Sequence, residues 1–116
     1  MIAQYTAASL VAELRTRAVP ASIQSVPTCA NTEDHVPMAP IAARRAAFAS
    51  AAATDVIAIE LLLACQALDL RGVAPAPALG AAYSAIRARV PAMVEDRVVA
   101  DDIAAVRDLV AAGTIS

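Results

Sequence analysis

The spacing of apolar residues divides the chain into four predicted helices. Apolar groups recur at near-helical spacing across Ile2–Ala18, and this helix is expected to stop before Pro20. No proline or glycine interrupts Ala42–Leu70, which predicts one helix of about 40 Å at 1.5 Å per residue. Gly80–Val90 and Asp101–Ala112 each carry apolar residues on one face and predict two shorter amphipathic helices. No stretch alternates as a strand would, so the predicted fold class is all-α.

A long loop is expected between the first two helices. Helix is not expected to persist between residues 19 and 41, because four prolines lie there: Pro20, Pro27, Pro37 and Pro40. A loop of this length inside a compact protein is usually functional. The sequence therefore places the candidate site in this segment.

The second half of the longest predicted helix, Val56–Leu68, is apolar on nearly every side. A helix that is hydrophobic all round is buried, and three shorter neighbours are too few to cover one this long. We therefore expect surface from outside the chain to cover it. The run is about 13 residues long and is broken by Glu60 and Gln66, well short of the roughly 20 needed to cross a bilayer, so no membrane segment is expected.

Composition narrows the class of protein further. Of the 116 residues, 59% are hydrophobic but only 3% are aromatic, which leaves few bulky side chains for an independent core. The net charge of -2 argues against a nucleic-acid partner, which would call for a basic face. Two cysteines, Cys29 and Cys65, make no disulfide framework and fit a reducing cytosol, so a cytoplasmic location is expected.

The dense cluster of reactive side chains is Thr28–His35, inside the predicted loop. Glu33, Asp34 and His35 could ligate a metal, but adjacent residues rarely converge on one ion and there is no second histidine, so no metal site is expected. Cys29 and His35 could form a nucleophile pair, for which no orienting third group is evident. A carboxylate on a rigid loop could also bind a polar substrate or act as a general base. Composition alone favours a solvated acidic loop.

The sequence of the loop favours a functional loop over a solvated acidic one. Pro20–Met38 reads PASIQSVPTCANTEDHVPM and resembles the PASVDSIPTSANQEDHVSM stretch of histidine ammonia-lyase, within the wider aromatic amino-acid lyase and aminomutase family. Other segments are also similar: Met1–Ala8, Ala42–Arg44, Ala58–Leu62, Gln66–Arg71, Val90–Pro91, Glu95–Arg97 and Asp102–Ile103. The resemblance implies the C-terminal helical segment of an ammonia-lyase bundle, in a family whose members are several-fold longer.

We expect the chain to consist of three parts that together form one incomplete domain. Residues 1–18 are expected to be a helix and residues 19–41 an active-site-type loop. Residues 42–116 are expected to hold the long helix and the C-terminal helices.

The resemblance also implies site residues. Glu33 matches the active-site glutamate that histidine lyases use toward the substrate imidazole, and so implies catalytic and substrate-binding roles. Met1 matches a residue that lines the same pocket. A carboxylate accepts a strong charge-assisted hydrogen bond from an imidazole N–H, which favours L-histidine as the substrate and urocanate as the product. A tyrosine or phenylalanine lyase or aminomutase fragment, or a non-catalytic helical remnant or interaction module, remains an alternative.

The same resemblance implies a cofactor that this sequence does not encode. The family acts through a methylidene-imidazolone formed from an internal Ala-Ser-Gly tripeptide, whereas the Ala-Ser pairs here precede Leu10, Ile23 and Ala51. We therefore expect a fragment that is inactive alone and is completed by a part bearing the methylidene-imidazolone. The expected partners are further copies, as in the family's homotetramer, or a complementing N-terminal lyase half.

Overall fold

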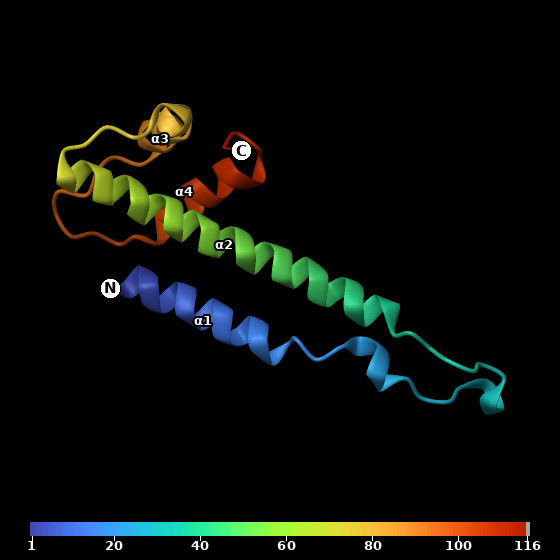
Figure 1. Cartoon of the computed structure of the whole chain (residues 1–116). Helices are drawn as coiled ribbons and strands as arrows, with labels where there is room; N and C mark the ends of the chain where they lie inside the picture. Colours follow the sequence, from blue (N-terminus) through green and yellow to red (C-terminus); the bar gives the residue numbers. More distant parts are fainter. Residues whose placement is uncertain (116) are drawn as a thin grey trace.

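The computed structural model describes residues 1–115 and contains, in that range, four α-helices and no strand (Figure 1). These observations confirm the all-α fold class. Three short 3₁₀-helices lie in the connections. The four α-helices are α1 (Ile2–Thr16), α2 (Ala39–Arg71), α3 (Gly80–Arg89) and α4 (Ala100–Ala111).

The start of α2 differs from the expectation. The helix begins at Ala39, three residues before the expected Ala42. Pro40 does not prevent this earlier start, because it lies in the first turn of the helix. A proline is tolerated there, since its missing N–H would have no partner within the helix. At the other end, Gly72 adopts a left-handed conformation with φ of 62° and closes the helix, a role that suits glycine.

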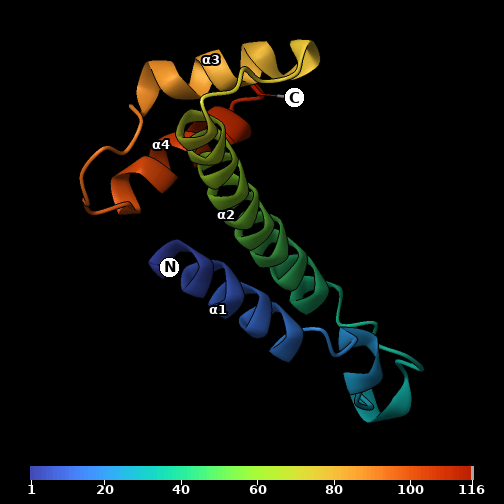
Figure 2. The same ribbon diagram turned by 60° about the vertical axis from the view of Figure 1, so that its left-hand side comes forward.

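Helix α2 is the spine against which the other helices pack. Helix α1 runs antiparallel beside it, α4 packs against it at an oblique angle, and α3 lies across its C-terminal end (Figures 1 and 2). The core lies where α2, α3 and α4 meet, and its buried residues are Ala58, Leu62, Cys65, Ile86, Val90, Val106 and Leu109. The core therefore occupies only one end of the long helix.

The apolar run in α2 is covered on one side. Ala58 and Ile59 are buried, whereas Ile57 and Leu63 are 45% and 47% exposed. By length and composition alone, the whole of α2 could cross a membrane. The shorter run Val56–Leu68, on which the sequence expectation rests, is too short to do so. Its packing against the three other helices favours the core helix of a soluble protein.

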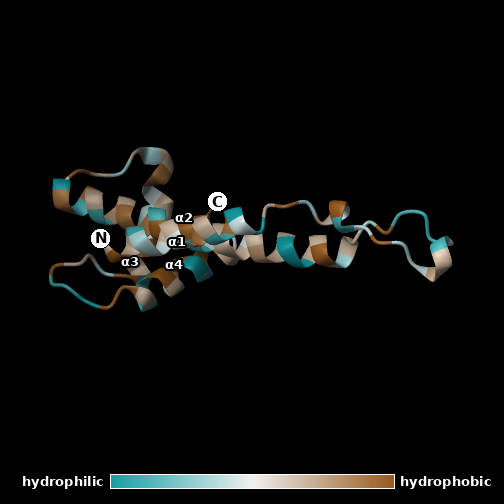
Figure 3. Cartoon of the chain, turned by 90° about the horizontal axis from the view of Figure 1, so that it is seen from below, coloured by the Kyte–Doolittle hydropathy of each residue, from teal (hydrophilic) through white to brown (hydrophobic). Residues whose placement is uncertain are grey.

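The molecule is strongly elongated. Its radius of gyration is 19.7 Å and its extents are 68 × 27 × 20 Å, whereas a compact chain of this length has a radius of about 13 Å. Its accessible surface is 7937 Å², about 2,000 Å² more than a compact monomer of this mass exposes. Apolar stretches lie in the connecting segments as well as in the helices (Figure 3). The excess of about 2,000 Å² is the size of a large protein interface.

Candidate functional site

The segment that contains Glu33 forms the tip of the loop between α1 and α2 and projects beyond the helices (Figure 1). Every residue from Cys29 to His35 is exposed. Within residues 1–115, the side chains of Glu33, Asp34 and His35 form no hydrogen bond or ion pair. The carboxylate of Glu33 is therefore free to bind a group from outside this part of the chain.

Backbone contacts shape the two limbs of this loop. An isolated antiparallel bridge joins Thr28 to Glu33. Farther from the tip, the backbone N–H of Val36 donates to the Ser25 hydroxyl oxygen over 3.1 Å. These contacts fix where the backbone of Glu33 lies relative to the incoming limb.

Between the two bridged residues the backbone makes a left-handed turn. Cys29, Ala30 and Asn31 have φ values of 50°, 52° and 67°. The N–H of Asn31 donates to the carbonyl of Thr28 over 3.0 Å, and the N–H of Thr32 donates to the carbonyl of Cys29 over 3.0 Å. The turn thus reverses the chain immediately before Glu33.

The metal site and the nucleophile pair considered for this loop can be compared with the positions of its side chains. The described residues hold no group of three or more His, Cys, Asp or Glu side chains placed to bind a metal ion. Cys29 is a free, exposed thiol, and no hydrogen bond joins it to His35 in the part of the chain that the structure covers.

Met1 lies away from the loop tip, at the start of α1. It contributes to a groove of about 930 Å³ between α1, α2 and the segment that leads into α4. Apolar side chains dominate this groove, among them Ile2, Leu63, Met93, Val99 and Ile103. Glu33 is not part of it, so the described chain does not bring together the two residues that the resemblance assigns to one pocket.

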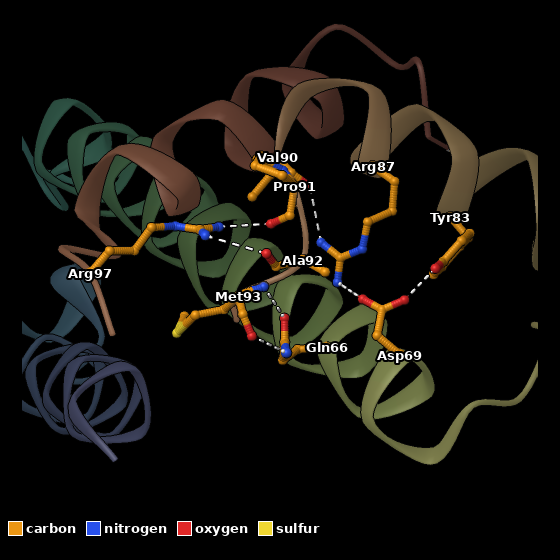
Figure 4. A network of polar contacts seen from close by, with 9 residues as sticks. All are labelled: Gln66, Asp69, Tyr83, Arg87, Val90, Pro91, Ala92, Met93 and Arg97. Atoms are coloured by element: carbon orange, nitrogen blue, oxygen red, sulfur yellow. Dashed lines mark hydrogen bonds and ion pairs between the residues drawn. The ribbon is translucent and has the colours of Figure 1, made fainter. Parts of the chain in front are cut away.

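Sequence reasoning missed a polar network at the C-terminal end of α2 (Figure 4). The Tyr83 hydroxyl donates to the Asp69 carboxylate, and Arg87 lies 2.6 Å from the same carboxylate in a close but poorly aligned ion pair. The hydrogen bond from Tyr83 holds the pKa of Asp69 below its ordinary value of 3.8, and the same bond raises the pKa of Tyr83 above 10.0. Arg87 also donates to the carbonyl of Val90 over 3.0 Å.

A second part of this network holds the segment between α3 and α4. The Gln66 amide donates to the carbonyl of Met93 over 3.0 Å, and the Met93 N–H donates to the Gln66 side-chain oxygen over 2.8 Å (Figure 4). Arg97 donates to the carbonyl of Pro91 over 2.7 Å and pairs with Asp102 over 2.9 Å. This segment forms one wall of the groove that contains Met1.

One sequence signal could have indicated the network. Gln66 and Asp69 are polar residues three positions apart in a helix that is otherwise apolar there, so they share a face. Polar side chains on a packed face are usually hydrogen-bonded.

Comparison with known proteins identifies the family. A family model described as aromatic amino acid lyase matches residues 1–88. The chain belongs to the aromatic amino acid lyase family. Among its relatives, histidine ammonia-lyase from Symbiobacterium thermophilum is 53% identical over 116 residues, and that from Natranaerobius thermophilus is 47% identical over 116 residues.

Solved structures of lyase-family proteins share this fold. Histidine ammonia-lyase from Trypanosoma cruzi superposes with a TM-score of 0.92 at 41% identity, covering 97% of this chain and 23% of that one. Tyrosine aminomutase from Streptomyces globisporus superposes with a TM-score of 0.90 at 43% identity, covering 96% of this chain and 21% of that one. The elongated shape is therefore the shape that this segment has within larger lyase-family chains.

The chain spans about a quarter of the length of the curated relatives it matches. The Symbiobacterium and Natranaerobius alignments each cover 99% of this chain and 23% of the relative. The Ala-Ser-Gly tripeptide implied by the resemblance does not occur in these 116 residues. Two of the Ala-Ser pairs, Ala8–Ser9 and Ala49–Ser50, lie inside α1 and α2, so this chain's residues do not fit that cofactor.

Proposed function

We propose that this chain is the C-terminal segment of a histidine ammonia-lyase and contributes Glu33 to the binding of L-histidine. The observation that carries the proposal is the exposed, unpaired carboxylate of Glu33 at the tip of a projecting loop. The near-complete alignment with curated histidine ammonia-lyases supports it. The elimination of ammonia to give urocanate requires a methylidene-imidazolone supplied by another part of the enzyme.

The chemistry of Glu33 suits an imidazole. An ionised carboxylate only accepts hydrogen bonds, and an imidazole N–H is a donor at the end of the histidine side chain. In a site closed off from water this charge-assisted bond contributes about 1.5–3 kcal/mol, while an apolar ring would leave the carboxylate unpaired. Glu33 thus holds and orients the ring and selects against phenylalanine.

The exposed surface supports an obligate partner. About 2,000 Å² of excess surface, including the groove at Met1, calls for the remaining part of a lyase or further copies of this chain. Met1 and Glu33 lie apart in one chain, so a pocket containing both would need a second chain. We propose a cytoplasmic homo-oligomer, with no nucleic-acid or membrane partner.

A tyrosine lyase or aminomutase is the second candidate. It is supported by the match to the Streptomyces globisporus tyrosine aminomutase, which is nearly as similar in fold as the Trypanosoma enzyme. The same loop would then present Glu33 to a phenol hydroxyl, which can also donate a hydrogen bond.

A chimeric enzyme distinguishes these candidates. The matching segment of the Symbiobacterium lyase would be replaced by this chain, and the purified chimera given L-histidine or L-tyrosine. We expect urocanate from histidine and little turnover of tyrosine. A folded chimera that converts tyrosine and not histidine would favour the second candidate, and one that converts neither would contradict the proposal.

A matched pair of substitutions tests the role of Glu33. Glu33→Gln replaces a charge-assisted bond with a neutral one and is expected to lower kcat/KM for histidine by about tenfold or more. Asp34→Asn removes the same charge from the neighbouring exposed residue and is expected to have little effect. Equal losses in the two variants would contradict the assignment to Glu33.

The 116-residue chain by itself is expected to be inactive, because it cannot form the electrophile. Urocanate produced by the pure chain above the buffer rate would overturn this expectation.

A further inference from the structure

Two of the three residues in the left-handed turn before Glu33, Cys29 and Ala30, do not favour that conformation. Glycine adopts positive φ freely and asparagine tolerates it, whereas the Cβ of other residues crowds the following carbonyl. Just beyond the C-terminal ends of α2 and α4, the residues with positive φ are glycines, Gly72 and Gly113. In the loop, Cys29 and Ala30 carry the same conformation with side chains. The backbone is therefore strained at these two positions.

Little within the described chain holds this strain. All residues from Cys29 to His35 are exposed, so no packed side chain stabilises the turn. Two turn hydrogen bonds, donated by Asn31 and Thr32, and the bridge from Thr28 to Glu33 are its supports. Strained backbone persists where surrounding structure over-determines it, and it clusters at functional sites.

We propose that this left-handed turn aims Glu33 at the substrate, with Ala30 as a positioning residue. The inference rests on the proposed function of Glu33. Because Glu33 is bridged to Thr28, the turn between them sets the direction of its backbone. Ala30 occupies the middle of the turn, with φ of 52° and ψ of 41°, so its conformation determines whether the two limbs meet.

The size of the side chain at position 30 should therefore control the turn. Glycine removes the Cβ that crowds the carbonyl and favours the left-handed conformation. Valine adds two γ-carbons and makes positive φ a genuine outlier. The two substitutions are opposite tests of one backbone angle, at a position where neither side chain displaces a packed neighbour.

The first measurement is amide hydrogen exchange of Thr32 in the 116-residue chain, since its N–H donates across the turn to Cys29. We expect protection of this amide to rise about tenfold in Ala30→Gly and to fall by a similar factor in Ala30→Val, given the cost of left-handed backbone. Ala111→Val, at an exposed position in α4, is the control for adding the same two methyl groups. Protection that is the same in all variants would overturn the inference.

The second measurement is the steady-state kinetics of the chimera with L-histidine. We expect Ala30→Val to raise KM by about tenfold, as for a misaligned charge-assisted bond, and Ala30→Gly to keep KM at or below that of the unsubstituted chimera. A loss of folded enzyme alone would lower the apparent kcat and leave KM unchanged. In the background of Glu33→Gln, Ala30→Val should raise KM no further, because it acts through Glu33.

The outcomes separate the two claims. An active chimera whose KM does not change in Ala30→Val would overturn the positioning role and leave the proposed function standing. An additive effect of Ala30→Val and Glu33→Gln would do the same. A folded chimera that is inactive with histidine contradicts the proposed function, and the positioning role is then overturned with it.

Discussion

The contact between Gln66 and Met93 allows a sharp test of how the groove is built. Replacing Gln66 with leucine keeps a similar volume and removes two hydrogen bonds, of 2.8 and 3.0 Å, to the backbone of Met93. Each neutral bond contributes about 1 kcal/mol, and the partly buried N–H and carbonyl left behind raise the total to about 2–3 kcal/mol. This is a large share of the about 5–15 kcal/mol that stabilises a typical domain.

Amide hydrogen exchange at Met93 measures this loss directly. If the contact holds the segment between α3 and α4, exchange at Met93 should accelerate by about 30- to 140-fold in Gln66→Leu. Gln4→Leu makes the same change at an exposed position in α1, and exchange at Met93 should not respond to it. Unchanged exchange in Gln66→Leu would refute the view that this contact holds the wall of the groove.

Three further predictions concern stability and reactivity. Ile86 is 1% exposed, so Ile86→Ala should lower the free energy of unfolding by about 2–5 kcal/mol in urea titrations. The pKa of Asp69 is lowered in the folded chain, so its contribution to the free energy of unfolding is present above pH 3.8 and should be lost as pH falls through the folded pKa. The pKa of Tyr83 is raised, so its contribution is present below pH 10.0 and should be lost as pH rises through its folded pKa. The free energy of unfolding, measured against pH, should therefore fall at both the acid and the alkaline end. Burial raises the pKa of the Cys65 thiol, so iodoacetamide should alkylate exposed Cys29 much faster, and equal rates by mass spectrometry would contradict this.

The helices could be predicted from the sequence because their signals are local. Apolar periodicity and the prolines located all four, and the error at the start of α2 arose because Pro40 is compatible with a first helical turn. The acidic residues of α4, Asp101 and Asp102, lie in its first turn, where the helix dipole favours them.

The geometry of the site was beyond sequence reasoning. The left-handed turn at Ala30 has no glycine to indicate it, so it is visible only in the backbone. The separation of Met1 and Glu33 depends on the direction in which the loop leaves α1, which periodicity does not encode. Resemblance to a family supplied Glu33, since composition alone favoured a solvated acidic loop.

We propose that this chain is one part of a lyase and that the rest of the enzyme covers its exposed apolar surface. The decisive measurement is sedimentation velocity of the chain mixed with the Symbiobacterium lyase lacking its matching segment. We predict that the two sediment together as a large complex. If the chain instead stays a separate, monodisperse monomer in the mixture, the rest of a lyase does not cover its apolar surface.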